Sequence, residues 1–235
     1  MLRILSLAFA VIAFGSLAAS AADSAYRDPS GRFSVTVPDG WTGKAVGDAQ
    51  VALVIAAPGS DDFGGLCIVS VKEIAEMRSL SQAQIDEVFT KELNRTFWET
   101  VFQAANAKDV AIEDSGMREQ NGHRAYYALA SATVTLPTGA VVRMTSKIQM
   151  QVIPGSFHAI NCRSNTDVYA SFSPQFETVL ASHIPLGSGY IASLPHSGPV
   201  TLGLGSVRPD ARSTVNAARA MVSDQLRLAQ YPHRR

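Results

Sequence analysis

Alternating apolar and polar residues mark the first strands of the chain. Residues 32–37 alternate strictly between the two kinds of side chain, which is the period of a strand with one buried face. The Pro-Asp-Gly turn at 38–40 follows, and it predicts that Trp41 folds back against the sheet. Two further apolar runs, 51–57 and 66–71, are rich in Val and Ile and predict two more strands joined by a flexible loop.

One long helix is predicted after these strands. Ser81 and Gln84 have the spacing of a capping box, in which each side chain bonds to the backbone of the other residue. From there an apolar residue recurs at every fourth position, which places these side chains along one face of a helix. The apolar stripe consists of Ile85, Phe89, Leu93, Phe97 and Val101. Because charged residues lie off this stripe, we expect the stripe to cover a sheet.

The second half of the chain predicts an antiparallel meander. Four strand-like segments, 109–117, 124–136, 141–153 and 157–163, are separated by short turns such as Asn-Gly and Pro-Gly. Connections this short join antiparallel neighbours, since a parallel pair needs a crossover of about a dozen residues or more. The predicted fold class is therefore α+β, with a central antiparallel sheet flanked by helices.

A second helix is predicted to close this domain. Ser173 suits the N-cap position, and Pro174 suits the first position inside a helix. Apolar residues from Phe176 to Ile184 share one face of this helix, and Pro185 ends it.

The two ends of the chain differ from this domain in composition. Residues 1–21 have a basic start, an apolar core and small residues at the end, which predicts a secretory signal peptide and a periplasmic or secreted protein. Retention of this segment as an N-terminal anchor is the alternative. Residues 22–186 form the predicted domain, 187–211 a linker rich in Gly and Pro, and 212–235 a tail with a weak helix. The tail is either frayed or a docking helix for a partner.

Charge excludes one class of partner. The chain carries 20 Lys and Arg residues against 20 Asp and Glu residues. A protein that binds nucleic acid normally shows a strongly basic face or segment, so we expect no nucleic-acid partner. An apolar fraction of 46% with 17% charged residues is typical of a globular chain rather than a disordered one.

The two cysteines are predicted to pair. Cys67 and Cys162 belong to a chain that is predicted to be exported, and disulfides persist in such compartments. On the chain-entropy model, a disulfide that closes a loop of about 100 residues stabilises the fold by up to about 4.7 kcal/mol. A reactive thiol is the alternative, but the chain lacks a C-x-x-C motif.

A family resemblance lies in the order of several short motifs. These are Tyr-Arg-Asp at 26–28, Gly-Arg-Phe-Ser-Val at 31–35, Pro-Asp-Gly-Trp at 38–41, the hairpin 122–127 and the strand 157–162. In this order they resemble the PsbP-like and Mog-type α/β/α sandwich domains, over residues 26–186. The resemblance implies a central antiparallel sheet with helices on its faces. The family includes photosystem II accessory subunits, a Ran-binding protein and many exported bacterial proteins, and it is not mainly a family of enzymes, so the resemblance implies no catalytic residue.

The sequence lacks the familiar motifs of serine hydrolases, zinc peptidases and phosphate-binding loops. His158 and Cys162 share one face of a predicted strand, as two metal ligands would, but a zinc site requires a third protein ligand that the sequence does not supply. Asp61 and Asp62 lie in a glycine-rich loop without the oxygen spacing of a calcium site. We therefore predict no catalytic, cofactor-binding or metal-binding residue, and no cofactor.

Two pairs of neighbouring aromatic residues are candidates for a recognition surface. In Tyr126-Tyr127 and in Phe97-Trp98, one member of each pair points away from the face that its neighbour uses. An exposed member contributes apolar area to a binding patch, although single exposed aromatic residues are common. Residues 94–96 match a glycosylation sequon but fall inside the predicted long helix, so we interpret them as a chance match.

Together these patterns predict a noncatalytic exported domain that binds a protein or an envelope component, for example as an accessory subunit. The basis is an organised core without a catalytic constellation, followed by a linker and a helix suited to docking. The alternative is an enzyme or a small-ligand carrier, with a pocket between the sheet and a helix that includes His123 or His158.

Overall fold

The computed structural model describes most of the predicted domain. The described residues are 23–46, 51–60, 64–136, 139–186, 215–216, 219–220 and 222–223. The predicted signal peptide, the Asp61-Asp62 pair and the predicted linker lie outside the described residues, as does most of the predicted tail.

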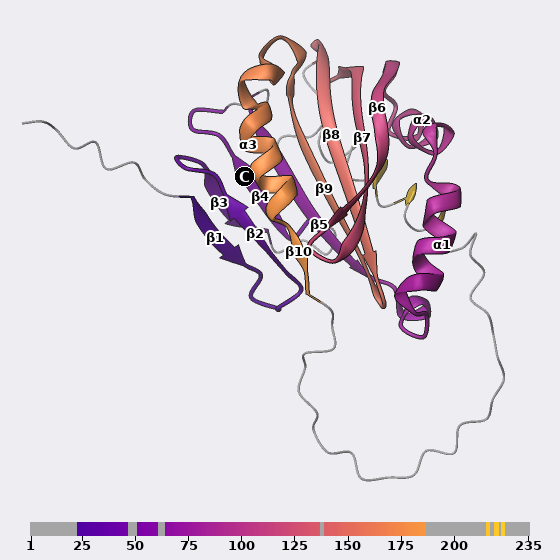
Figure 1. Cartoon of the computed structure of the whole chain (residues 1–235). Coiled ribbons are helices and arrows are strands. Elements are labelled where there is room, and N and C mark those ends of the chain that lie inside the picture. The colour runs from indigo at the N-terminus through magenta and orange to yellow at the C-terminus, as the bar shows by residue number, and fades with distance from the viewer. Residues whose placement is uncertain are drawn as a thin grey trace, which may run out of the picture.

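The strands of the described chain form two sheets in which each pair of neighbours is antiparallel (Figure 1). The large sheet contains, in spatial order, β3 (Thr42–Ala45), β4 (Leu53–Ala56), β5 (Leu66–Glu73), β9 (Ser156–Asn165), β8 (Val141–Ile153), β7 (His123–Thr135) and β6 (Lys108–Gln120). The small sheet contains β1 (Ser24–Arg27), β2 (Phe33–Val37) and β10 (Ile184–Pro185). Because β6, β7, β8 and β9 are neighbours in chain order, the predicted meander is confirmed, as is the α+β class.

The turn between β6 and β7 consists of Asn121 and Gly122, whose φ angles are 52° and 78°. Positive φ at both central residues is typical of a type I′ turn, whose twist matches that of the flanking strands. Gly adopts this conformation freely, and Asn adopts it more readily than most residues. The turn fixes a register in which Gln120 lies opposite His123.

The prediction of one long helix after Ser81 is wrong. The structure contains two helices there, α1 (Gln82–Glu92) and α2 (Arg95–Ala104). The predicted capping box is confirmed, since Ser81 and Gln84 bond to each other's backbone. The break follows from Asn94, whose side chain accepts a hydrogen bond from the Phe97 backbone N–H at 3.1 Å and begins a new helix. The predicted apolar stripe still faces the sheet, because both helices bury the same side.

The helix that closes the domain begins earlier than predicted. Helix α3 spans Tyr169–Ser182, so Ser173 and Pro174 are interior residues and the predicted cap at Ser173 is wrong. The additional first turn packs against an aromatic residue outside the helix, and the ring of Phe172 lies 5.9 Å from that of Trp41. These tertiary contacts outweigh the local preference of proline for the start of a helix.

The prediction that Ile184 belongs to this helix is also wrong. Ile184 and Pro185 form β10, in which they lie opposite Ser34 and Phe33 of β2. A residue that precedes proline is disfavoured in the helical region, which explains the change from helix to extended backbone after Ser182.

Apolar side chains fill both sides of the large sheet. On one side lie α3 and the small sheet, and the core there includes Phe33, Leu53, Val69, Ile160, Phe176 and Leu180. On the other side lie α1 and α2, and the core there includes Phe89, Trp98, Val101, Tyr126, Ile148 and Phe157. On its side of the sheet, α3 contacts β8, where the Gln149 side chain donates a hydrogen bond to the Leu180 carbonyl at 3.1 Å. No described helix has both the length and the apolar character needed to cross a membrane.

A disulfide joins two adjacent strands in the middle of the large sheet. Cys67 of β5 and Cys162 of β9 lie directly opposite each other, with an S–S distance of 2.05 Å, and both side chains are fully buried. The disulfide predicted from the sequence is present, and it links residues 95 positions apart.

Six described residues near the C-terminus have helical backbone, and two of them, Arg219 and Ser223, contact α2. Val215 and Val222 are buried in the core that α1 and α2 share with the sheet. The Ser223 hydroxyl donates a hydrogen bond to the Val101 carbonyl at 3.3 Å. These apolar side chains therefore contact their own chain, and a docking role for them with a partner requires their release from α2.

Candidate functional site

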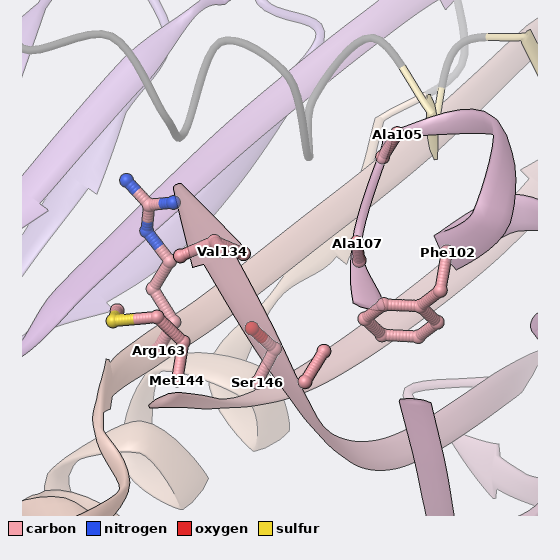
Figure 2. A pocket seen from close by; sticks show the side chains of 8 residues that line it. Phe102, Ala105, Ala107, Val134, Met144, Ser146 and Arg163 are labelled. Carbon is pink, nitrogen blue, oxygen red and sulfur yellow. The ribbon is translucent and has the colours of Figure 1, made fainter. Parts of the chain in front are cut away.

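A small cavity lies beside the C-terminal end of α2 (Figure 2). Figure 2 shows Phe102 at one side of it and Arg163 with Met144 at the other. Its volume is about 20 Å³, and a cavity of this size holds about one water molecule. This cavity is therefore too small to accept a substrate or a cofactor.

A wider and open depression of about 420 Å³ lies on the surface between α1 and β7. Lys91 pairs there with Glu87 at 2.8 Å, and Arg124 lies 3.6 Å from Asp86. Because two acidic and two basic side chains line this depression, it offers no net charge that would select a ligand.

Three histidines from distant parts of the sequence meet between α3 and the large sheet. His123 begins β7, His158 lies in β9, and His183 follows α3. The rings of His158 and His183 lie 5.3 Å apart, and both residues are 1% exposed. His123 and His158 were predicted from the sequence as residues of the alternative pocket. His183 was not, because it falls within the predicted second helix.

Burial is the main cause of an unusual pKa in both buried rings. It lowers the pKa of His183 from 6.5 to about 3, with a smaller contribution from His123. The pKa of His158 also lies well below 6.5, because of burial first and then of His183, Arg32 and His123. Both rings are therefore uncharged at neutral pH. A catalytic histidine must contact its substrate. Both rings are buried in this conformation, so no substrate in solvent reaches them.

The metal site considered from the sequence does not form at Cys162, because its sulfur is bonded to Cys67. Within the described residues, no three side chains of His, Cys, Asp or Glu are grouped so that they hold a metal ion. His158 instead lies beside His183, and its Nε2 atom is 3.0 Å from the Ser156 hydroxyl.

Tyr126 and Tyr127 point to opposite faces of the large sheet, Tyr126 into the core under α1. Tyr126 is 3% exposed under α1, whereas Tyr127 is half-buried on the opposite side of the sheet, the side on which α3 lies. The expectation of an exposed member in the Phe97-Trp98 pair is wrong, because these residues are 3% and 1% exposed. Helix α2 is covered by the sheet and by the C-terminal residues, where the Arg219 guanidinium lies 5.7 Å from the Phe97 ring centroid.

Two cations flank the ring of Tyr127. The Arg118 guanidinium carbon and the Lys147 Nζ lie 5.9 Å and 5.7 Å from the ring centroid. Both side chains pair with Glu177 of α3: Arg118 Nη1 lies 3.5 Å from its Oε2, and the Lys147 ammonium donates to its Oε1. Arg118 also donates a hydrogen bond to Gln149 Oε1 at 2.6 Å. We call the group of Arg118, Tyr127, Lys147 and Glu177 the Tyr127 face, and its one carboxylate faces two cations.

Comparison with known proteins finds structures of similar fold but does not assign an activity to this chain. No family model and no curated protein matches the chain. A cyanobacterial PsbP (CyanoP) from Synechocystis is similar at 18% identity and a TM-score of 0.47, over 70% of this chain and 93% of that one. LpqN, involved in cell envelope biogenesis of Mycobacterium tuberculosis, is similar at 11% identity and a TM-score of 0.49, over 70% and 91%. The Ran-binding protein Mog1p of Saccharomyces cerevisiae is similar at 11% identity and a TM-score of 0.44, over 71% and 97%.

These similarities are at 11% to 18% identity. They concern the fold, and a fold of this kind does not by itself define a ligand or a partner.

Proposed function

We propose that this protein is a noncatalytic exported domain that binds a protein or an envelope component through the Tyr127 face. The observation that carries the proposal is the position of the half-buried Tyr127 ring on β7, between two cations and beside α3. A tyrosine offers apolar area and a hydroxyl on one rigid ring, and such residues contribute strongly at binding surfaces. Arg118 and Lys147 beside the ring supply charge that orients a partner.

Two features support the proposed exported location, in the periplasm or outside the cell. The sequence of residues 1–21 has the pattern of a secretory signal peptide. The buried disulfide between Cys67 and Cys162 suits an oxidising compartment.

A small-ligand carrier or an enzyme is the second candidate. The observation that favours it is a set of three buried ring nitrogens, His123 Nδ1, His158 Nδ1 and His183 Nε2, which have no hydrogen-bond partner among the described residues. Polar groups that meet between a sheet and a helix are typical of a ligand site. Because His158 and His183 are sealed, a ligand reaches them only when α3 moves. A ligand at this place would change the NMR signals of these two imidazoles, which binding at the Tyr127 face leaves unchanged.

Site-specific cross-linking tests the leading proposal. A photoreactive phenylalanine analogue is placed at Tyr127 in the full chain, expressed in its source cell. The matched control carries the same analogue at Gln103, which is exposed on α2 at the other side of the large sheet. We expect a specific adduct from position 127 and none from position 103, and the adduct should disappear when Arg118 and Lys147 are both replaced by Ala. An absent adduct at 127, or the same adduct from both positions, contradicts the proposal.

A second measurement identifies the class of partner. Purified protein is sedimented with envelope fragments before and after protease treatment of the fragments. Loss of binding after the protease indicates a protein partner, and retained binding indicates another envelope component. In both cases Tyr127→Ala should reduce sedimentation, whereas Gln103→Ala should not.

A further inference from the structure

Each ring of the buried pair of His158 and His183 has one nitrogen without a hydrogen-bond partner among the described residues. His183 Nδ1 lies 2.7 Å from Gln151 Oε1, and the amide nitrogen of the same Gln151 donates to the Gln120 carbonyl at 3.4 Å. The Gln151 oxygen is therefore an acceptor, and His183 carries its proton on Nδ1. His183 Nε2 and His158 Nδ1 are both buried without a partner in the described part of the chain. A proton added to either atom would be a buried, unpaired donor on a charged ring.

The groups around the pair do not neutralise such a charge. From the small sheet, Arg32 lies near enough to lower the pKa of His158, although less than burial does, and Arg32 is itself paired with Asp28 at 2.8 Å. From β7, His123 acts on both rings in the same direction. Opposite His158 in β5 lies the apolar Val71, followed by Lys72 and Glu73.

The remaining neighbours are uncharged. These are Gln120 of β6, Gln151 of β8, Ser156 of β9 and Phe33 of β2, whose ring lies 5.7 Å from that of His183.

His183 also stands where three parts of the fold are joined. It ends α3, and the next residues form β10, which pairs with β2 of the small sheet. Its carbonyl accepts hydrogen bonds from the Asn121 side chain at 2.9 Å and from Gln120 at 3.4 Å, both at the tip of the β6–β7 hairpin. Its ring contacts Phe33 of β2 and His158 of β9. A change at this one position therefore acts on α3, the small sheet and the large sheet together.

We propose that the His158–His183 pair is a proton-sensitive latch, which holds the end of α3 and β10 on the large sheet when both rings are uncharged and releases them when one ring takes up a proton. Release exposes the ring to water, where it is solvated as a cation. The rest of the large sheet, with its disulfide and the core under α1 and α2, stays folded at the same pH. This latch does not depend on the Tyr127 face.

The direction of the pH effect follows from linkage. Because the folded pKa of His183 is about 3 and that of a free imidazole is 6.5, the released state binds more protons than the latched state between these values. Release is therefore favoured as the pH falls below 6.5. For one ring, the gain at a pH of about 4.5 is about 100-fold in the equilibrium between the released and the latched state.

Hydrogen exchange of the intact protein tests the latch. Protection factors are measured by mass spectrometry and NMR from about pH 7 to about pH 4.5, after correction for intrinsic exchange rates. The reporters are the amides of β2 and of Leu186, whose N–H donates to the Arg32 carbonyl at 2.7 Å. We expect their protection to fall at least tenfold, while the amides of β7 and β8 change less than threefold. Equal loss in both regions, or no loss in β2 and Leu186, overturns the proposal.

Variants distinguish titration of the His158–His183 pair from titration of other groups as the cause of the pH response. His158→Gln and His183→Gln each remove one titrating ring, and we expect either variant to reduce the pH response of Leu186 at least threefold. The control His196→Gln, outside the described residues, should respond as the unaltered protein does. If the two variants fold but keep the full response, the latch is assigned to the wrong groups. If the variants do not fold, the proposal is tested only by the unaltered protein, in which the amides of β2 and Leu186 are compared with those of β7 and β8.

Protonation of Asp28 does not cause the expected loss of protection, because the measurements stop at about pH 4.5. Burial by itself raises the pKa of Asp28, but the hydrogen bonds from Arg32 outweigh it, so the pKa lies below 3.8. Asp28 therefore keeps its charge throughout the range used.

Discussion

The hydroxyl of Tyr127 lies over Gly116 of the neighbouring edge strand, where a Cβ atom would stand 3.1 Å from the phenolic oxygen. The two residues are directly opposite each other in the pairing of β6 and β7. Glycine at this position lets the tyrosine side chain lie across β6 instead of extending away from the sheet. Gly116 therefore shapes the Tyr127 face without contributing a side chain to it.

Gly116→Ala should displace the Tyr127 ring at little cost in stability. The added methyl group meets the far end of a side chain that is able to tilt, so we expect the free energy of unfolding to change by less than about 1 kcal/mol. NMR should show changed ring signals for Tyr127 and unchanged ones for Tyr126. Ser115→Ala is the control, since Ser115 lies opposite Ala128 instead. A loss of several kcal/mol on the same scale, or an unchanged Tyr127 signal, would contradict the contact.

Asn94→Ala should weaken the start of α2. Its side chain is the acceptor for the Phe97 N–H, and loss of such a cap lowers the free energy of unfolding by about 0.5–2 kcal/mol. Asn94→Asp keeps an acceptor at the same place and should retain most of the stability. Urea unfolding of the three proteins gives the comparison. Equal stability of Asn94→Ala and the unaltered chain would show that this cap does not hold α2.

Replacing both cysteines by Ala should lower the free energy of unfolding by about 2–5 kcal/mol. The reason is the long loop between Cys67 and Cys162, which the disulfide closes in the unfolded chain. Denaturant unfolding of the oxidised protein and of the double variant measures the difference. Thiol titration of the denatured, unreduced protein should find no free thiol, and two thiols per chain would disprove the bond.

Val222→Ala should reveal whether the C-terminal residues hold their place on α2 in solution. Val222 is fully buried in the core there, and removing buried methyl groups costs about 1–3 kcal/mol of unfolding free energy. Asn216→Ala, at an exposed position of the same segment, should change it by less than about 0.5 kcal/mol. Thermal unfolding of both variants distinguishes them. If the two variants behave alike, Val222 is not held in this core in solution.

Strands with one buried face were predictable, and short exposed strands were not. The alternation at 33–37 and the turns of the meander gave the strands and their order, because burial of one face leaves a period of two in the sequence. Strand β3 leaves no such trace, since all its residues are exposed and its pairing with β4 rests on backbone hydrogen bonds. Strand β10 depends on contact with β2, which lies far away in the sequence.

The break between α1 and α2 had a local signal that the apolar stripe concealed. Asn is among the best N-cap residues, and Asn94 with Phe97 three positions later has the spacing of a cap. The same residues match a glycosylation sequon, which is a chance match inside the predicted helix. The period of the stripe continues through the break, because both helices bury one side against the same sheet.

The candidate sites were only partly predictable for a different reason. Tyr127 follows from the alternation of β7, which places it opposite to Tyr126. The meeting of His123, His158 and His183 depends on the order of strands in the sheet and on where α3 ends, and neither is contained in the residues next to these histidines.

The pairing of β5 with β9 has a consequence for the biogenesis of the protein. The centre of the large sheet is made of strands whose cysteines stand 95 positions apart, so it forms only after the chain has been produced at least as far as β9. A product that ends between residues 67 and 162 carries Cys67 as a lone thiol. A quality-control protein that reacts with free thiols would therefore recognise such fragments. It would not react with the finished chain, in which both cysteines form the disulfide.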